Sequence, residues 1–207
     1  DNVMQAPWYK TRGPLQHGLL EDFSAVVDAC AAAKINTLVL PLVDDGSLET
    51  TEDHAALKSG LDIAHPVLAR NGMQIAFESD LAPDELREFI AGFPQQNYGL
   101  TYDMGNSAAL GFDPEEEFRA FGDRIIHVHI KDRIHGGSTV PLGEGDTHFA
   151  EVFRCLAMQG YRGDYILQTA RSGNDDHAGV LAAFREQSIS WINEAGLNAV
   201  GNGDTAK

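Results

Sequence analysis

Short apolar runs alternate with longer segments of helical periodicity along most of the chain. The apolar runs are nearly continuous and end in turn residues, which indicates strands buried on both faces of a parallel sheet. Five strands are predicted, at 36–43, 73–79, 98–105, 124–131 and 164–170. Six helices are predicted before, between and after them, at 19–34, 52–72, 83–92, 114–122, 148–160 and 175–196. Repeated units of strand and helix predict an α/β protein built on a parallel sheet.

One hydrophobic core is expected for nearly the whole chain. With 207 residues, of which 43% are hydrophobic, the sequence is long enough for one sizeable domain. We place this domain at residues 1–196 and expect the small, polar residues 197–207 to form a disordered tail. Pro66 falls inside the predicted helix 52–72, which it could kink or split.

Charge and cysteine usage restrict the partners and the compartment. The 31 acidic and 15 basic residues give a net charge of −16, which repels nucleic acid and anionic lipid because no basic patch is visible. No apolar run approaches the roughly 20 residues of a membrane span. Cys30 and Cys155 lack the spacing of a metal site or a disulfide framework, so we expect reduced core residues of a cytoplasmic protein. The sequence begins without a methionine, so an upstream segment is not excluded.

Polar side chains gather at the C-terminal ends of four predicted strands. They are Glu78, Asp103, His129, Lys131, Gln168 and Arg171. In a parallel α/β sheet or barrel, this edge is where functional sites are built. Within "RIIHVHIKDR" (124–133), the side chains of His127, His129 and Lys131 alternate along the strand and therefore share one face. We expect that face to point into the mouth of a barrel.

A divalent metal ion would explain three of these strand ends at once. Glu78, Asp103 and His129 would form an oxygen-rich site with one imidazole, which suits Mn²⁺, Mg²⁺, Co²⁺ or Zn²⁺, and Gln168 could add an amide oxygen. Each residue also has a simpler interpretation. Glu78 could cap the next helix, Asp103 could form an Asx-turn, and His127 is more typical of a core histidine than of a ligand.

The segments "FES", "YDMGN", "HVHIKDR", "VPLGEGD" and "YILQTAR" resemble the xylose isomerase-like barrel family of sugar and sugar-phosphate isomerases and epimerases. The resemblance runs from about Met4 to Gly196 and implies a (β/α)8 TIM barrel. Such a barrel usually needs about 250 residues, so we expect the first two strands to be missing from this chain. An open remnant with two exposed sheet edges is the alternative. "NVM" (2–4) would then end the third strand, and 4–18 would be a rim loop whose Trp8 and Tyr9 could cover substrate or pack on a partner subunit.

The resemblance also implies roles for individual residues. In the family, a glutamate, an aspartate, a histidine and a second glutamate hold one metal ion, and the first three match Glu78, Asp103 and His129. The fourth position is Gln168, and this departure puts epimerisation in doubt because relatives use both glutamates as bases on opposite faces of an enediolate. Isomerisation needs one base, so Glu78 could serve, with Lys131 as the second catalytic residue. Either Lys131 or Arg171 would neutralise developing charge or hold a phosphate. Predicted substrate contacts are Asn106, where relatives often have histidine, together with His127, Glu144 and the phosphate candidate Arg171.

These observations favour a divalent-metal-dependent isomerase or epimerase of a sugar or sugar phosphate, which could form a homo-oligomer. The alternative is a barrel that has lost catalysis and binds only metal or carbohydrate, with Gln168 as the mark of that loss. The same family shape includes apurinic-site endonucleases that gather many histidines. Scattered histidines, Asn106 in place of an imidazole and the net charge of −16 disfavour a nuclease.

Overall fold

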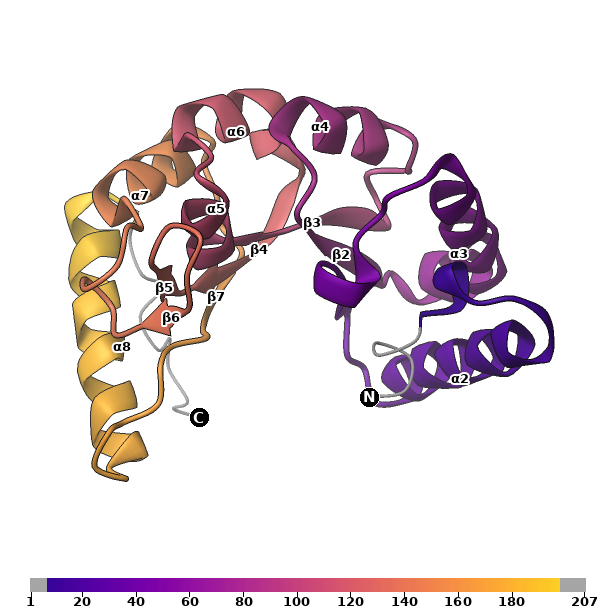
Figure 1. Ribbon diagram of the computed structural model, residues 1–207, viewed down its shortest axis with the longest axis horizontal. Helices are drawn as coiled ribbons and strands as arrows, with labels where there is room; N and C mark the ends of the chain where they lie inside the picture. Colours follow the sequence, from indigo (N-terminus) through magenta and orange to yellow (C-terminus); the bar gives the residue numbers. More distant parts are fainter. Residues whose placement is uncertain (1–6, 198–207) are drawn as a thin grey trace, which may run out of the picture. The chain divides into compact units, whose positions relative to one another are not determined.

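The sheet is the frame that positions the candidate site. The structure is a computed structural model that describes residues 7–197. Its main sheet has the strand order β1-β2-β3-β4-β7 (Figure 1). The strands are β1 (Thr37–Leu42), β2 (Gln74–Ser79), β3 (Tyr98–Asp103), β4 (Ile125–Ile130) and β7 (Asp164–Leu167). Every one of them lies within its predicted range, and the pairs β1–β2, β2–β3 and β4–β7 are parallel, as predicted.

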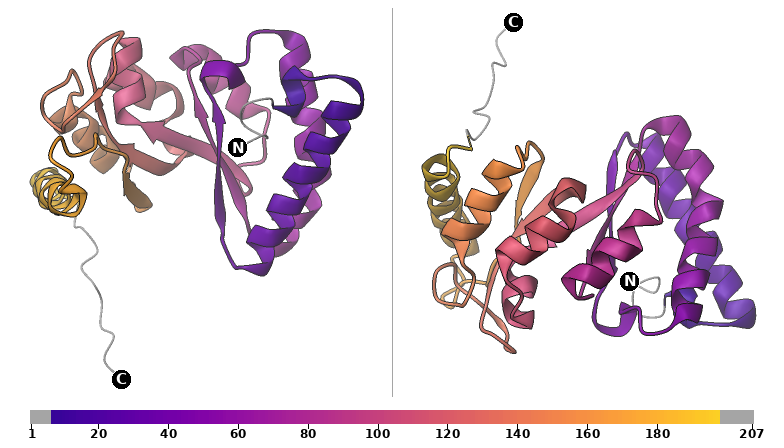
Figure 2. Two further views of the ribbon diagram at one scale, coloured as in Figure 1. Left: turned by 60° about the horizontal axis from the view of Figure 1, so that its bottom comes forward. Right: turned by 90° about the horizontal axis from the view of Figure 1, so that it is seen from above.

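The chain divides into two compact units, and the division falls between Thr101 and Tyr102 inside β3. The N-terminal unit contains α2 (Gly13–Ala32), α3 (Thr51–Asn71) and α4 (Pro83–Ala91). Figure 2 shows α2 and α3 side by side. A capping box formed by Thr50 and Asp53 starts α3, and Gly72 ends it in the left-handed conformation. Pro66 lies inside α3 without splitting it.

The segment before α2 does not form the predicted rim loop. Trp8–Lys10 is a short 3-10 helix, and α2 begins at Gly13, earlier than the sequence pattern predicted. Trp8 and Tyr9 are fully buried. The ring centroid of Trp8 is 4.5 Å from that of Phe23, and its indole covers Gly60, where no Cβ would fit. The prediction that these aromatic side chains cover substrate or a partner is therefore wrong, because they fill the core of the N-terminal unit.

The C-terminal unit contains α5 (Met104–Leu110), α6 (Pro114–Phe121), α7 (Phe149–Met158) and α8 (His177–Glu194). Helices α7 and α8 lie side by side (Figure 1). Trp191 of α8 stacks on Phe149 of α7 at a centroid distance of 4.3 Å. A small hairpin joins β5 (Asp132–Arg133) to β6 (Thr139–Val140). Neither α5 nor the hairpin was predicted, because seven helical residues and two-residue strands give little periodicity.

Cys30 and Cys155 are free thiols. Cys155 is buried as predicted, whereas Cys30 is only half-buried and so is not a core residue. None of the helices in residues 7–197 is both long and apolar enough to cross a membrane. The strand expected at 2–4 and nearly all of the tail expected at 197–207 lie outside the described residues, and the assignment of 1–196 to one domain stays a prediction.

Candidate metal centre

Glu78 lies in the N-terminal unit, one residue before the end of β2. Glu78 is 8% exposed, and the three residues before it, including Phe77, are buried. Phe77 pairs with Leu100 of β3. Helix α4 takes Ala82 as its N-cap and has no side-chain cap, so Glu78 does not cap this helix. Glu78 therefore lies at the C-terminal end of a parallel strand, where the functional sites of α/β proteins are built.

Asp103 and His129 meet in the C-terminal unit. Asp103 is the last residue of β3 and also the N-cap of α5, where its Oδ1 accepts a hydrogen bond of 2.8 Å from the backbone N–H of Asn106. Its Oδ2 lies 3.4 Å from Nδ1 of His129, and both side chains are buried. The turn interpretation of Asp103 is thus correct for one oxygen. The other oxygen is directed to the imidazole.

Lys131 connects this pair to two amide side chains. Its Nζ donates to Oε1 of Gln168 at 2.9 Å and to Oδ1 of Asn106 at 3.2 Å, and it lies 3.4 Å from Oδ2 of Asp103. A Cβ on Gly105 would lie 2.7 Å from Cγ of Lys131. Glycine in "YDMGN" therefore leaves the space in which the lysine side chain crosses α5.

His127 and His129 share one face of β4, as predicted. Their ring centroids are 5.1 Å apart in an edge-to-face arrangement. Burial lowers the pKa of His127, and the neighbouring His129 lowers it further. A half-buried imidazole that is kept neutral agrees with the interpretation of His127 as a packed side chain beside the site.

The remaining predicted residues lie at the exposed margin. Gln168 follows β7 and is exposed, and its amide oxygen is the acceptor from Lys131 described above. Arg171 and Glu144 are exposed, and neither side chain has a hydrogen bond or ion pair within residues 7–197. Substrate contacts by Arg171 and Glu144 stay predictions.

Sequence reasoning missed the residue that organises the next loop. Asp132 is fully buried, and its carboxylate accepts hydrogen bonds from the backbone N–H groups of Gly143 at 2.8 Å, Gly145 at 2.9 Å and Thr147 at 3.1 Å. A Cβ on Gly145 would collide with Asp132. The paired motifs "VHIKD" and "LGEGD" therefore form one structural device, in which the aspartate of the first motif holds the glycine loop of the second.

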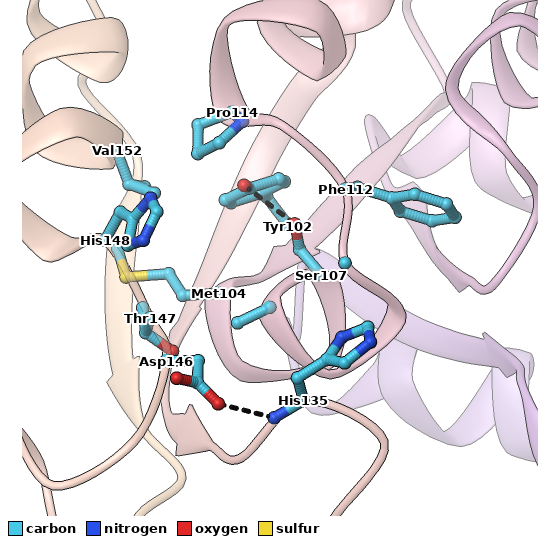
Figure 3. Close-up of a pocket in the computed structure, with 12 residues that line it drawn as sticks. Tyr102, Met104, Ser107, Phe112, Pro114, His135, Asp146, Thr147, His148 and Val152 are labelled. Carbon is cyan, nitrogen blue, oxygen red and sulfur yellow. Dashed lines mark hydrogen bonds between the residues drawn. The ribbon is translucent and has the colours of Figure 1, made fainter.

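A cavity of about 260 Å³ lies elsewhere in the C-terminal unit (Figure 3). Its lining includes Tyr102 and Ser107 but none of Asp103, His129 and Lys131. Behind these two hydroxyls, Glu117 accepts hydrogen bonds from Tyr102 at 2.7 Å and Ser107 at 2.5 Å. Burial raises the pKa of Glu117 to about 7. The acidic first turn of α6 is the one feature of the sequence that pointed to this group.

Glu78, Asp103 and His129 form a group of buried side chains that could hold a metal ion. The donor set consists of two carboxylates and one imidazole. Hard and borderline divalent cations such as Mg²⁺, Mn²⁺, Co²⁺ and Zn²⁺ accept such donors, whereas soft copper prefers sulfur. The residues therefore fit the kind of metal site that was predicted from the strand ends.

Three similar proteins show what this chain resembles. L-ribulose-5-phosphate 3-epimerase UlaE of Escherichia coli is 32% identical over 101 residues, which cover 48% of this chain and 36% of the relative. The match therefore spans about a third of that relative's length. A xylose isomerase domain protein from Planctomyces limnophilus has a TM-score of 0.73 at 19% identity, covering 87% of this chain and 68% of that one. The IOLI protein with a bound zinc atom has a TM-score of 0.74 at 17% identity, covering 89% and 73%.

One further match covers enough of the chain to show its family. A family model described as the xylose isomerase-like TIM barrel matches residues 15–194. The two solved structures support the barrel fold, and the parallel strands of this chain agree with part of such a barrel. The chain belongs to the xylose isomerase-like TIM barrel family.

Proposed function

We propose that this chain carries the metal site of an isomerase or epimerase that acts on a sugar or sugar phosphate. The observation that carries the proposal is the group of Glu78, Asp103 and His129. The curated relative is named as an epimerase of a sugar phosphate, which supports the same class of reaction. When bound, a divalent ion would polarise the carbonyl and the adjacent hydroxyl of the sugar.

Side chains of this protein have the remaining roles. Glu78, Asp103 and His129 would bind the metal ion, with Gln168 proposed as a fourth ligand. Glu78 acts as the base that takes a proton from the carbon beside the carbonyl and returns it to the neighbouring carbon. Lys131 neutralises the negative charge that develops on the substrate oxygens, and Asn106 binds a sugar hydroxyl. His127, Glu144 and Arg171 are kept as proposed substrate contacts, and a cytoplasmic location and a homo-oligomeric state stay predictions.

Substitution of Glu78 tests the proposed function. The protein is loaded with Mn²⁺ or Co²⁺, and exchange of a substrate C–H proton with deuterated water is followed by NMR. Glu78→Gln keeps an oxygen ligand but removes the base, so exchange is expected to slow at least about 100-fold. Glu85→Gln, an exposed glutamate of α4 in the same unit, is the matched control and should exchange at the normal rate. Firm metal binding without exchange on any sugar tested would instead favour the barrel that only binds metal or carbohydrate.

Substitution of Gln168 tests whether protons are transferred on one face of the enediolate or on both faces. Its Oε1 accepts from Lys131 at 2.9 Å, so Gln168→Glu would place a carboxylate beside a positive charge. The variant would restore the second glutamate that the family resemblance implies. We expect epimerised product to form about tenfold faster relative to isomerised product, measured by chromatography of the sugar products.

Gln96→Glu, at an exposed position of the N-terminal unit, is the control for the added negative charge. An unchanged product ratio in Gln168→Glu would show that residue 168 takes no part in proton transfer.

A further inference from the structure

Two cationic side chains of the C-terminal unit converge on one neutral oxygen. Oδ1 of Asn106 accepts from Nη1 of Arg133 at 2.8 Å and from Nζ of Lys131 at 3.2 Å. Arg133 was not among the residues that the sequence singled out. An amide oxygen satisfies hydrogen bonds but cannot neutralise two positive charges. Such a convergence stands out in a chain with a net charge of −16.

Lys131 and Arg133 have one ion-pair partner between them in the described part of the chain. Within residues 7–197, the one carboxylate in ion-pair range of Lys131 is Asp103, at 3.4 Å, and Arg133 forms no ion pair at all. Asp103 is proposed above as a metal ligand, so its negative charge is shared. A half-buried guanidinium without an ion-pair partner is available to an anion from outside the protein.

Arg133 is held firmly and still has donors to spare. Its Nε and Nη2 donate to the backbone carbonyl of Gly137 at 3.1 and 2.7 Å, which braces the hairpin. A guanidinium has five N–H donors, so one N–H on each terminal nitrogen remains. Two N–H groups on the two ends of the fork are what phosphate and carboxylate groups bind in a bidentate manner.

The surrounding contacts fix both cations in place. Arg133 pairs with Thr139 in the hairpin. The preceding residue, Asp132, accepts a hydrogen bond from the backbone N–H of Gly143. Lys131 comes directly after β4, and Asn106 lies in the helix that Asp103 caps. Preorganised donors of this kind bind an anion without the cost of ordering flexible side chains.

We propose that Lys131 and Arg133, gathered on Asn106, bind the phosphate or carboxylate group of an anionic sugar substrate. This inference rests on the proposed function for the identity of the ligand as a sugar. Recognition of the anionic group by Arg133 was not predicted from the sequence, which suggested Lys131 or Arg171 as the residue that holds a phosphate. Arg162, an exposed arginine of the same unit, is the matched control.

Binding of inorganic phosphate to the full chain tests the site without requiring catalysis. Titration followed by ³¹P NMR line broadening should give at least tenfold weaker binding in both Arg133→Gln and Lys131→Met, and a change of less than twofold in Arg162→Gln. The side chain of Lys131 makes no contact with the hairpin brace, so loss of binding in both variants cannot come from an unfolded hairpin. Unchanged binding in Lys131→Met, or an equal loss in Arg162→Gln, would overturn the assignment.

A kinetic experiment identifies the anionic group. Values of kcat/KM are compared for a ketopentose 5-phosphate, the same ketopentose without phosphate, and a keto sugar acid. Arg133→Gln should lower kcat/KM at least tenfold for one or both anionic sugars and leave the neutral sugar within twofold. An equal decrease for the neutral sugar would overturn the assignment. If no sugar reacts while phosphate binding still depends on Arg133, the proposed function fails and the anion site stands.

Discussion

Replacement of His129 by alanine is expected to weaken metal binding about 1,000-fold, because removing one of a few ligands forfeits a large share of the binding free energy. Replacement of His127 by alanine should change metal affinity by less than about threefold and lower the free energy of unfolding by about 1 kcal/mol, the scale of an aromatic contact. The two imidazoles are 5.1 Å apart on one strand. Only His129 belongs to the group that could hold a metal ion.

The measurement is equilibrium titration of the chelator-treated protein with Co²⁺, whose visible absorption reports bound ion directly. Urea unfolding of both variants without metal separates loss of a ligand from loss of the fold. His127 is the matched control, since it is the same residue type on the same face of β4. Equal loss of Co²⁺ binding in both variants would contradict the assignment of His129 as the ligand.

The predictable part of this site came from the geometry of parallel strands. Side chains alternate along a strand, and parallel strands present their C-terminal ends at one edge, so Glu78, Asp103 and His129 could be placed together before the structure was known. The five strands were predicted because each is a short, nearly continuous apolar run bounded by turn residues.

The parts that could not be predicted depend on contacts between residues distant in sequence. Arg133 meets Asn106 across 27 positions, through a hairpin whose strands have two residues each. Trp8 and Tyr9 looked like exposed loop aromatics because nothing in their own segment shows that Gly60 of α3 leaves room for the indole. The start of α5 after Asp103 was not predicted. In the structure, one carboxylate both caps this helix and lies beside His129.

Glu117 should make the stability of the C-terminal unit depend on pH. Burial raises its pKa from an ordinary value of 4.5 to about 7, and the nearby Asp113 acts in the same direction. Tyr102 and Ser107 donate hydrogen bonds to the carboxylate, which favours its charged form, but desolvation is the larger effect. Between these two pH values the folded state holds a proton that the unfolded state has lost.

This extra proton determines whether the free energy of unfolding rises or falls with pH. The stabilisation is fully present below pH 4.5 and is lost as the pH rises through about 7. The free energy of unfolding should therefore fall by about 3 kcal/mol over this range on account of Glu117 alone. Glu117→Gln keeps an oxygen that accepts from both hydroxyls but cannot ionise, so this contribution should vanish and the variant should exceed the parent in stability at pH 8.

Urea unfolding at intervals from pH 4.5 to 8 measures this difference, and subtraction of the variant from the parent removes the effect of other carboxylates. Glu116→Gln is the matched control, because Glu116 is the adjacent residue of α6 and is exposed. A difference between the parent and Glu117→Gln that stays constant with pH would show that Glu117 is already charged when buried. The two hydroxyls would then outweigh desolvation, and the wall behind the cavity would carry a fixed negative charge at neutral pH.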